Sequence, residues 1–320
     1  MTAVDLSGRA AIVTGAGRGR GRAIAVALAA RGVSVAVAAR TERVWDDRLP
    51  GTIGQTVADI EAAGGRAVGV RADLLDPEDR HRLVAQAREA LGPITILVNN
   101  AAFTAPGRPP RPGAASPPDK AANPPRLGAP GGSADAGATK PGAAESNAAK
   151  PAWPSMFDIP LAAYRRHFEI SVFAAHELMQ LVRPDMIAAG VGAVVNITSA
   201  ASRLPGSGPY PDRNRSPLAG YGGAKAALEH LTQCAAYDLA GHNIAVNALS
   251  PSTPIGTPGL SYWQQFDRGF DDMASAEEFA RAAVLLAQVD PAAATGRVTD
   301  PRSQTPRASV RSLSAGRPRM

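Results

Sequence analysis

A tyrosine and a lysine four residues apart, in the segment YGGAK (221–225), are the residues best placed to do chemistry. The apolar run around them predicts a helix over 218–240, and residues at this spacing share one helix face. A free phenol has a pKa of about 10, and a nearby ammonium group favours the phenolate. Tyr221 could then exchange a proton while a hydride moves between a carbinol carbon and a nicotinamide. The alternative is a surface pair without a catalytic role.

A serine at the end of an expected strand could assist this tyrosine. Ser199 closes the apolar stretch GAVVNITS (192–199), which predicts a buried strand. A hydroxyl there could hydrogen-bond to the substrate oxygen beside Tyr221. A serine at a strand end is, however, also a common turn former.

A glycine-rich turn, TGAGRGRG (14–21), follows the first apolar run. Its spacing fits T-G-x-x-x-G-x-G and not G-x-G-x-x-G. Glycines between a strand and a helix let backbone N–H groups approach a pyrophosphate. The position favours a dinucleotide site over a plain tight turn. The residues expected to bind the cofactor there are Thr14, Gly15, Gly19 and Gly21.

The residue after the second expected strand bears on the choice of cofactor. Arg40 stands where many dinucleotide folds have a carboxylate for the ribose 2′-hydroxyl. A guanidinium suits a 2′-phosphate, and Arg18 in the glycine turn could help. We therefore favour NADP(H) over NAD(H), with NAD(H) and a solvent-exposed Arg40 as the alternative. Asp73, after the third expected strand, could accept a hydrogen bond from the adenine amino group.

Apolar runs alternate with helical stretches along most of the chain. The expected strands are 10–14, 33–39, 66–73, 94–100, 192–199 and 243–250, and the expected helices are 22–31, 53–63, 77–91, 160–189, 218–240 and 275–288. This alternation has the spacing of βαβ units. It predicts an α/β fold: a single Rossmann-like, doubly wound parallel sheet with helices on both faces.

One segment interrupts the alternation. Residues 103–153 are mostly Pro, Ala and Gly and hold too few large apolar residues to offset their chain entropy. We expect a disordered insertion in one domain, 1–299. A basic tail, 300–320, follows, and a net charge of +6 resides largely in 297–320. We expect a disordered tail and no nucleic-acid partner, with a nucleic-acid-binding arm as the alternative.

Other classes of protein fit the sequence poorly. No apolar run approaches the roughly 20 residues that span a bilayer. The N-terminus lacks the basic segment of a signal peptide. Cys234 is the only cysteine, so neither a disulfide framework nor a cysteine metal site is expected. We expect a cytoplasmic protein that acts on a small molecule and needs no metal.

These residues together resemble the short-chain dehydrogenase/reductase family. The matching motifs are TGAGRGRG (14–21), Asp73-Leu74, NNAA (99–102), Ser199, Tyr221/Lys225 and VNALSPSTPIGTP (246–258). They occur in the family's order and cover nearly all of 5–299 apart from the insertion. Residues 51–65 and 244–251 look more like the hydroxysteroid dehydrogenase-like subgroup.

The resemblance implies roles for individual residues. Tyr221 would be the catalytic acid/base, Lys225 would favour its phenolate and hold the nicotinamide ribose, and Ser199 would position the substrate oxygen. Asn99 and Thr257 would join the cofactor-binding residues. Segment 251–272 would be a mobile substrate lid, and the chain would form a homodimer or homotetramer.

The sequence also departs from the family. Ser171 stands where the family has a catalytic asparagine, which holds a water that relays protons to the lysine. An extra loop, 203–217, would border the substrate pocket. The residues after Gly296 put the final strand in question. These departures motivate the alternative of a nucleotide-binding member of the family with weak or no catalysis.

Overall fold

The computed structural model describes residues 3–44, 47, 49–103, 156–206, 208–209, 218–251, 253–258 and 275–301. The predicted insertion, apart from Phe103, lies outside the described residues. The same holds for the basic tail beyond residue 301 and for most of the expected lid (251–272). Most of the expected extra loop (203–217) also lies outside the described residues.

Seven parallel strands form one sheet, in the order β3-β2-β1-β4-β5-β6-β7. The strands are β1 (Ala10–Thr14), β2 (Ser34–Ala39), β3 (Ala67–Arg71), β4 (Ile94–Asn99), β5 (Gly192–Ile197), β6 (Ile244–Leu249) and β7 (Val298–Thr299). The order reverses beside β1, where β2 lies on one side and β4 on the other. Such a switch point leaves a crevice at the carboxyl ends of the strands. The predicted doubly wound fold is confirmed.

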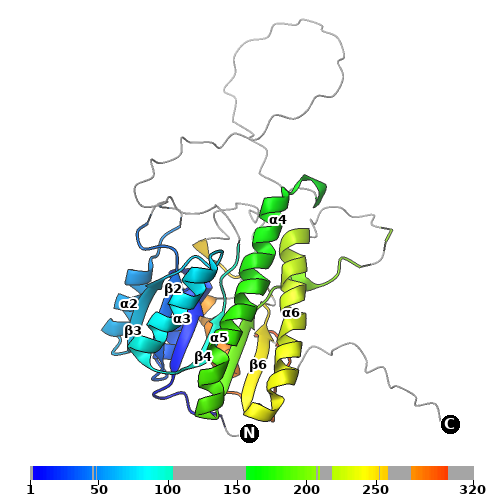
Figure 1. Ribbon diagram of the computed structural model, residues 1–320. Coiled ribbons are helices and arrows are strands. Elements are labelled where there is room, and N and C mark those ends of the chain that lie inside the picture. Colours follow the sequence, from blue (N-terminus) through cyan, green and yellow to red (C-terminus); the bar gives the residue numbers. More distant parts are fainter. Residues whose placement is uncertain are drawn as a thin grey trace, which may run out of the picture.

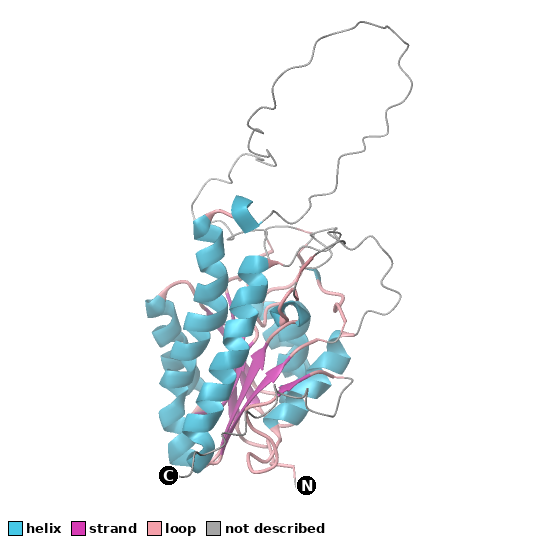
Figure 2. Ribbon diagram, turned by 90° about the vertical axis from the view of Figure 1, so that its right-hand side faces the viewer, coloured by secondary structure: helices cyan, strands magenta, loops and turns pink. Residues whose placement is uncertain are grey.

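Helices cover both faces of this sheet, as Figures 1 and 2 show. One face packs against α1 (Gly19–Ala29), α2 (Ile53–Ala62) and α8 (Ala276–Ala287). The other face packs against α3 (Pro77–Leu91), α5 (Ala174–Ala189) and α6 (Ala219–Leu239). Among the described residues, no helix is both long and apolar enough to cross a membrane.

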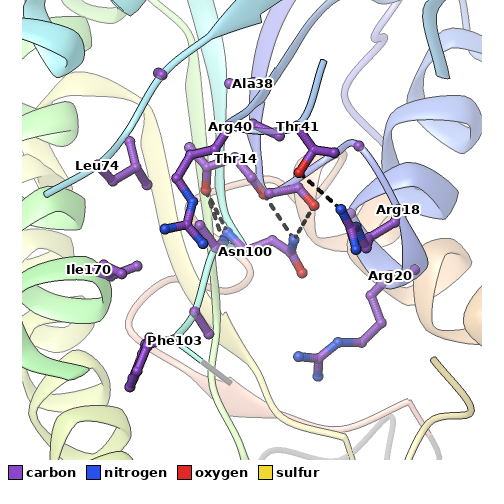
Figure 3. A pocket seen from close by; sticks show the side chains of 18 of the residues that line it. Thr14, Arg18, Arg20, Ala38, Arg40, Thr41, Leu74, Asn100, Phe103 and Ile170 are labelled. Atoms are coloured by element: carbon purple, nitrogen blue, oxygen red, sulfur yellow. Dashed lines mark hydrogen bonds between the residues drawn. The ribbon is translucent and has the colours of Figure 1, made fainter. Parts of the chain in front are cut away.

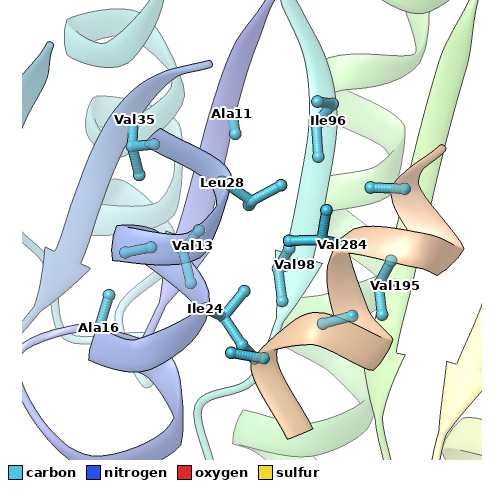
Figure 4. Packing of buried hydrophobic residues seen from close by; sticks show 14 of the residues in the cluster. Ala11, Val13, Ala16, Ile24, Leu28, Val35, Ile96, Val98, Val195 and Val284 are labelled. Atoms are coloured by element: carbon cyan, nitrogen blue, oxygen red, sulfur yellow. The ribbon is translucent and has the colours of Figure 1, made fainter. Parts of the chain in front are cut away.

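The two apolar layers follow the alternation of side chains along each strand. In β1, Ala11 and Val13 belong to the layer under α1 and α8, whereas Ala10 and Ile12 belong to the opposite layer. Figure 4 shows Ile24 and Leu28 of α1 meeting Val284 of α8 above the central strands. This packing fixes the end of β1, and therefore Thr14, at the centre of the crevice.

The single helix expected over 160–189 is divided into three parts. It consists of α4 (Leu161–Phe168), a π-helical turn, η2 (Glu169–Phe173), and α5. The amide of Ala174 donates to the carbonyl of Glu169, five residues back, instead of the usual four. A π-turn leaves the apolar spacing almost intact, so periodicity could not predict it. Such turns are frequent at functional sites.

The final strand that the sequence put in question is present. β7 pairs with β6, and the amide of Ser250 donates to the carbonyl of Thr299 at 2.8 Å. The side chain of Asn247 also accepts from the amide of Arg297 at 3.0 Å. β7 pairs through backbone hydrogen bonds, which do not depend on the family's usual side chains. The buried Asn247 binds the backbone of the residue that precedes this strand.

The remaining described helical turns are short. They are η1 (Met156–Asp158), η3 (Ala200–Ser202) and η4 (Ala240–His242). Of these, η3 follows β5 directly and packs against α6. It therefore lies at the same edge of the sheet as the crevice.

Candidate active site

The crevice at the switch point collects most of the residues expected to bind a cofactor. Its lining comes from the start of α1 and from the carboxyl ends of β1 to β4 (Figure 3). It includes the predicted residues Thr14, Gly15, Arg18, Gly19, Gly21, Arg40, Asp73 and Thr257. Residues that are far apart in the sequence thus form one surface.

Hydrogen bonds between β1 and β4 give the crevice a rigid floor. The hydroxyl of Thr14 accepts from the amides of Asn100 at 3.0 Å and Ala101 at 3.1 Å. The side-chain amide of Asn100 donates in return to the carbonyl of Thr14 at 2.9 Å. These reciprocal bonds join the ends of two neighbouring strands, as the dashed lines in Figure 3 show.

Two glycines of the turn have no room for a side chain. A Cβ at Gly21 would lie 2.3 Å from the carbonyl oxygen of Gly15 and 2.5 Å from Nδ2 of Asn100. Gly15 has a φ of 66°, in the left-handed region that other residues avoid. The backbone therefore turns tightly into α1 and presents the N-terminus of that helix to the crevice. This cradle fits the pyrophosphate of a dinucleotide.

Three arginines give the crevice its positive charge. Arg18 precedes α1 and donates to the hydroxyl of Thr41 at 2.9 Å, which places its guanidinium beside the end of β2. Arg40 follows β2, and Arg20 lies between Gly19 and Gly21 of the turn. All three line the crevice (Figure 3).

The two amides of the NNAA motif have different surroundings. Asn99 donates to Oδ1 of Asn196 on β5 at 2.8 Å, and it is not among the lining residues of the crevice. Asn100 is a lining residue. Cofactor binding by Asn99 therefore stays a prediction. Asn100, which carries the same sequence signal, is the amide that faces the crevice.

Tyr221 and Lys225 lie one turn apart on α6. Nζ of Lys225 is 5.9 Å from the centre of the Tyr221 ring and donates to the carbonyl of Ile197 at 2.7 Å. The lysine side chain is only 1% exposed. Burial and, to a smaller extent, the charge of Arg20 lower the pKa of Lys225 to about 7, although Glu229 partly opposes them.

The other two predicted catalytic residues lie on elements that contact α6. Ser199 is the N-cap of η3, and its hydroxyl accepts from the amide of Ala201 at 3.2 Å. Ser171 lies in the π-turn η2 and is 3% exposed. Both η3 and η2 pack against α6. One helix thus gathers the elements that carry all four residues.

Comparison with known protein families matches both parts of the chain. Residues 9–112 match a family described as short chain dehydrogenase, and residues 143–299 match one described as Enoyl-(Acyl carrier protein) reductase. An uncharacterized oxidoreductase of Mycobacterium tuberculosis (strain CDC 1551 / Oshkosh) is 32% identical, over 78% of this chain and 70% of its own length. The chain belongs to the short-chain dehydrogenase/reductase family.

Two further similarities are to 7alpha-hydroxysteroid dehydrogenases. The enzyme of Escherichia coli (strain K12) is 28% identical, over 77% of this chain and 71% of its own. A solved 7alpha-hydroxysteroid dehydrogenase complexed with NADH and 7-oxo glycochenodeoxycholic acid superposes with a TM-score of 0.65 at 26% identity, covering 92% of this chain and 93% of that one. This short-chain dehydrogenase/reductase is thus an enzyme of the dehydrogenase/reductase class that resembles hydroxysteroid dehydrogenases.

Sequence reasoning missed two residues of the site. Arg20 lines the crevice with its guanidinium 5.6 Å from the ring centre of Phe279, and its charge reaches Lys225. The sequence placed Arg20 inside the glycine turn, but it could not show that the side chain lines the crevice. His167 lies one turn before Ser171 on the same helical stretch, and this spacing could have drawn attention to it.

His167 also connects the two halves of the site. Phe103 lines the crevice, and its ring centre lies 5.1 Å from that of His167 in an edge-to-face contact. The imidazole in turn lies 6.0 Å from the ring of Tyr221. A row of three rings therefore runs from the crevice to the predicted catalytic tyrosine.

Proposed function

We propose that this enzyme is an NADP(H)-preferring oxidoreductase that interconverts an alcohol and its carbonyl, with Tyr221 as the acid/base. The observation that carries this proposal is a buried lysine one turn from a tyrosine, close enough to the crevice for the charge of the lining residue Arg20 to act on it. One domain, 1–299, would carry the activity. Cofactor and substrate would meet between the crevice and α6.

The residues of the crevice would hold the cofactor, which supplies or accepts the hydride. The tight turn at Gly15 and Gly21 would receive the pyrophosphate on backbone amides. Arg40 and Arg18 would bind a 2′-phosphate, because a guanidinium donates two parallel hydrogen bonds to phosphate oxygens. The solved relative contains NADH, so the preference for NADP(H) rests on these two arginines alone.

Tyr221 would hold or release the proton of the reacting oxygen. In reduction, its hydroxyl gives a proton to the carbonyl oxygen as the carbon is reduced, and in oxidation the proton returns. The ammonium form of Lys225 would stabilise the phenolate that remains. Ser199 would donate a second hydrogen bond to the same oxygen and so orient the substrate.

The substrate class follows from apolar surroundings and from the relatives. Phe103 and Ile170 line the crevice on the side toward α4 and η2 (Figure 3). These residues favour a largely uncharged, lipid-like alcohol or ketone. A 7-oxo bile acid, the compound bound in the solved relative, is a sensible first member of a test panel.

A paired binding and turnover experiment tests the proposal. NADPH and NADH are titrated by fluorescence against the full chain, and turnover is measured on a panel of ketones and alcohols that includes 7-oxo bile acids. We expect turnover in wild type, and in Tyr221→Phe a loss of 10²-fold or more, roughly the usual contribution of an acid/base, with NADPH binding retained. Binding without turnover on any substrate would favour the alternative, a nucleotide-binding family member without useful catalysis. An active Tyr221→Phe variant would refute the assigned mechanism.

A further inference from the structure

Two buried charged residues of α3 hold the loop that follows β3. They are Asp79 and Arg80, which are 7% and 5% exposed, and neither lines the crevice. Charged side chains are almost never buried this deeply unless they are paired. Both residues form hydrogen bonds to the backbone of the loop, which itself lines the crevice.

Asp79 fixes the backbone of Asp73, the residue expected to meet the adenine. Oδ2 of Asp79 accepts from the amide of Asp73 at 2.8 Å, and Oδ1 accepts from Arg82. The side chain of Asp73 is also oriented, because its Oδ1 accepts from the amide of Leu75 at 3.2 Å. A carboxylate has about four lone-pair sites, so this bond does not prevent a further one from a ligand.

Arg80 joins the same loop to a second element of the crevice. Its Nη1 donates to the carbonyl of Leu74 at 2.6 Å and to Oε1 of Glu169 at 3.3 Å. Its Nε donates to Oε2 of Glu177 on α5. Glu169 begins the π-turn η2, and the next residue, Ile170, lines the crevice as Leu74 does. One guanidinium therefore fixes the loop after β3 relative to η2.

The surface held in this way suits an adenine ring. Leu74 and Ile170 lie on the same side of the crevice in Figure 3. An adenine ring has flat faces and a polar edge, with a donor at its amino group and an acceptor at N7. Apolar side chains suit the faces, and the carboxylate of Asp73 suits the amino group. Ligand sites commonly combine an apolar lining with a few polar groups that fix orientation.

We propose that Asp79 and Arg80 are positioning residues for the adenine end of the cofactor. Asp79 sets the carboxylate of Asp73 against the amino group, and Arg80 sets Leu74 relative to Ile170. Neither positioning residue touches the cofactor. This inference rests on the proposed function for the identity of the ligand, an adenine dinucleotide, but not for the catalytic step.

Replacing adenine by hypoxanthine tests the inference at a single group. The reduced hypoxanthine analogue of NADPH has an oxygen in place of the amino group, so the carboxylate of Asp73 would meet an acceptor instead of a donor. Both nucleotides carry the same fluorescent dihydronicotinamide and the same phosphates. Titration of the full chain with each gives a ratio of dissociation constants that reports recognition of the base. We expect wild type to bind NADPH about 10-fold more tightly or more, the effect of one hydrogen bond to a charged group.

Asp79→Ala should bring this ratio close to one, because NADPH binding weakens and binding of the analogue changes little. Asp79→Asn should restore most of the ratio, since its amide oxygen can accept from the amide of Asp73. If Asp79→Ala does not fold, Asp79→Ser is the second variant, with a polar side chain too short to reach that amide. A residue that only stabilised the fold would not change the preference between two bases. The wild-type ratio in a folded Asp79→Ala or Asp79→Ser variant would therefore overturn the role of Asp79.

Arg80→Met should also lower the ratio, because the loop that carries Asp73 is no longer fixed relative to η2. If this variant does not fold, Arg80→Lys replaces it, since one ammonium group lacks the fork of donors that a guanidinium has. Arg88→Met is the matched control. Arg88 also joins α3 to α5, through Asp185 at 2.9 Å, but among the described residues it bonds to none that line the crevice. An unchanged ratio in the Arg80 variant, or an equal change in Arg88→Met, would overturn the role of Arg80.

The outcomes separate this inference from the proposed function. If wild type turns over a substrate with NADPH but binds both nucleotides equally, the inference is wrong and the proposed function stands. If no alcohol or ketone is turned over, but the ratio is present in wild type and lost in the Asp79 and Arg80 variants, the inference stands and the proposed function fails. Wild type that binds neither nucleotide would refute both.

Discussion

Nζ of Lys225 lies 5.9 Å from the ring centre of Tyr221 and is bonded at 2.7 Å to the carbonyl of Ile197, the last residue of β5. The bond attaches to the central sheet the face of α6 that carries the proposed catalytic pair. The tyrosine and lysine are therefore positioned by regular elements and not by a loop. The charge of this lysine is sensitive to pH near neutrality, because burial and Arg20 both oppose it.

The first prediction concerns Lys225→Met and the pH dependence of stability. The lysine pKa is about 10.4 in an unfolded chain and about 7 in the fold. Between these values the unfolded state binds more protons, so the contribution of Lys225 to stability rises with pH and is least favourable below pH 7. We expect Lys225→Met to remove this rise. Urea unfolding of both proteins in steps from about pH 6 to 10 measures it.

Glu229→Gln is the companion variant for this prediction. Glu229 raises the pKa of Lys225 and accepts from the hydroxyl of Thr198 at 2.6 Å. Glutamine keeps an acceptor for that bond but removes the charge. The rise in stability should therefore begin at a lower pH than in wild type. Parallel curves for all three proteins would contradict a lowered lysine pKa.

The alternation of apolar runs with helical stretches predicted the sheet and its helices, because β1, β4, β5 and β6 are buried on both faces and are therefore nearly continuous apolar runs in the sequence. The glycine turn then located the carboxyl end of β1, and the YGGAK segment located the beginning of α6. The sequence did not show that α1 begins at Gly19, inside the glycine turn, and not at residue 22 as expected. Glycine is a poor helix former, and only packing against α8 and the sheet makes this first turn helical.

Side-chain direction was the part of the site that sequence could not supply. Asn99 and Asn100 carry the same signal, but successive strand residues point to opposite faces, and the register decides which one meets the crevice. The π-turn that contains Ser171 shifts the helix by only one residue, and the apolar pattern does not show so small a change. The ring contacts of His167 could not be predicted, because Phe103 and Tyr221 come from distant segments of the chain.

The second prediction concerns Arg40→Ser and cofactor choice. If Arg40 binds a 2′-phosphate, its loss removes a charge-assisted hydrogen bond of about 1.5–3 kcal/mol, or roughly 10- to 150-fold in affinity. NADPH binding should weaken by this factor, and NADH binding should change little. Fluorescence titration with each cofactor gives both constants.

Arg22→Ser is the matched control for Arg40→Ser. Arg22 lies in α1 near the glycine turn, but it pairs with Asp59 at 2.7 Å and does not line the crevice. Arg22→Ser should leave the affinities for NADPH and NADH unchanged. Equal losses of NADPH and NADH in Arg40→Ser would show that the arginine does not recognise the 2′-phosphate.

The third prediction compares two glycine substitutions. In Gly21→Ala the new Cβ would meet the backbone oxygen of Gly15 at 2.3 Å, so the turn must move, at a cost of about 1–3 kcal/mol. NADPH binding should fall strongly and the free energy of unfolding should decrease. In Gly54→Ala, inside α2, the Cβ would meet nothing within 4 Å. Alanine there should stabilise the chain by about 0.5–1 kcal/mol. Thermal unfolding and NADPH titration check both, and a neutral Gly21→Ala would mean that the cradle is looser than its geometry indicates.

The fourth prediction is a loss of stability in acid that depends on His167. The pKa of this imidazole is about 4 in the fold and about 6.5 in an unfolded chain. Between these values the unfolded state binds the extra proton, so stability falls as the pH is lowered from 6.5 to 4, by an amount on the order of 3 kcal/mol at the lower end. The titratable groups beside the ring are Lys225 and Tyr221 from α6 and Tyr164 from its own helix. Lys225 is already protonated in most of this range and cannot produce the same slope.

His167→Gln should therefore flatten the stability profile between pH 4 and 6.5, whereas His176→Gln, at an exposed histidine, should keep the wild-type profile. Urea unfolding of the three proteins, with NMR titration of the imidazole signals in wild type, makes the measurement. A flattened profile would show that burial between the rings of Phe103 and Tyr221 keeps His167 neutral near pH 7. The same slope in His167→Gln as in wild type would show that burial does not lower the pKa of this imidazole.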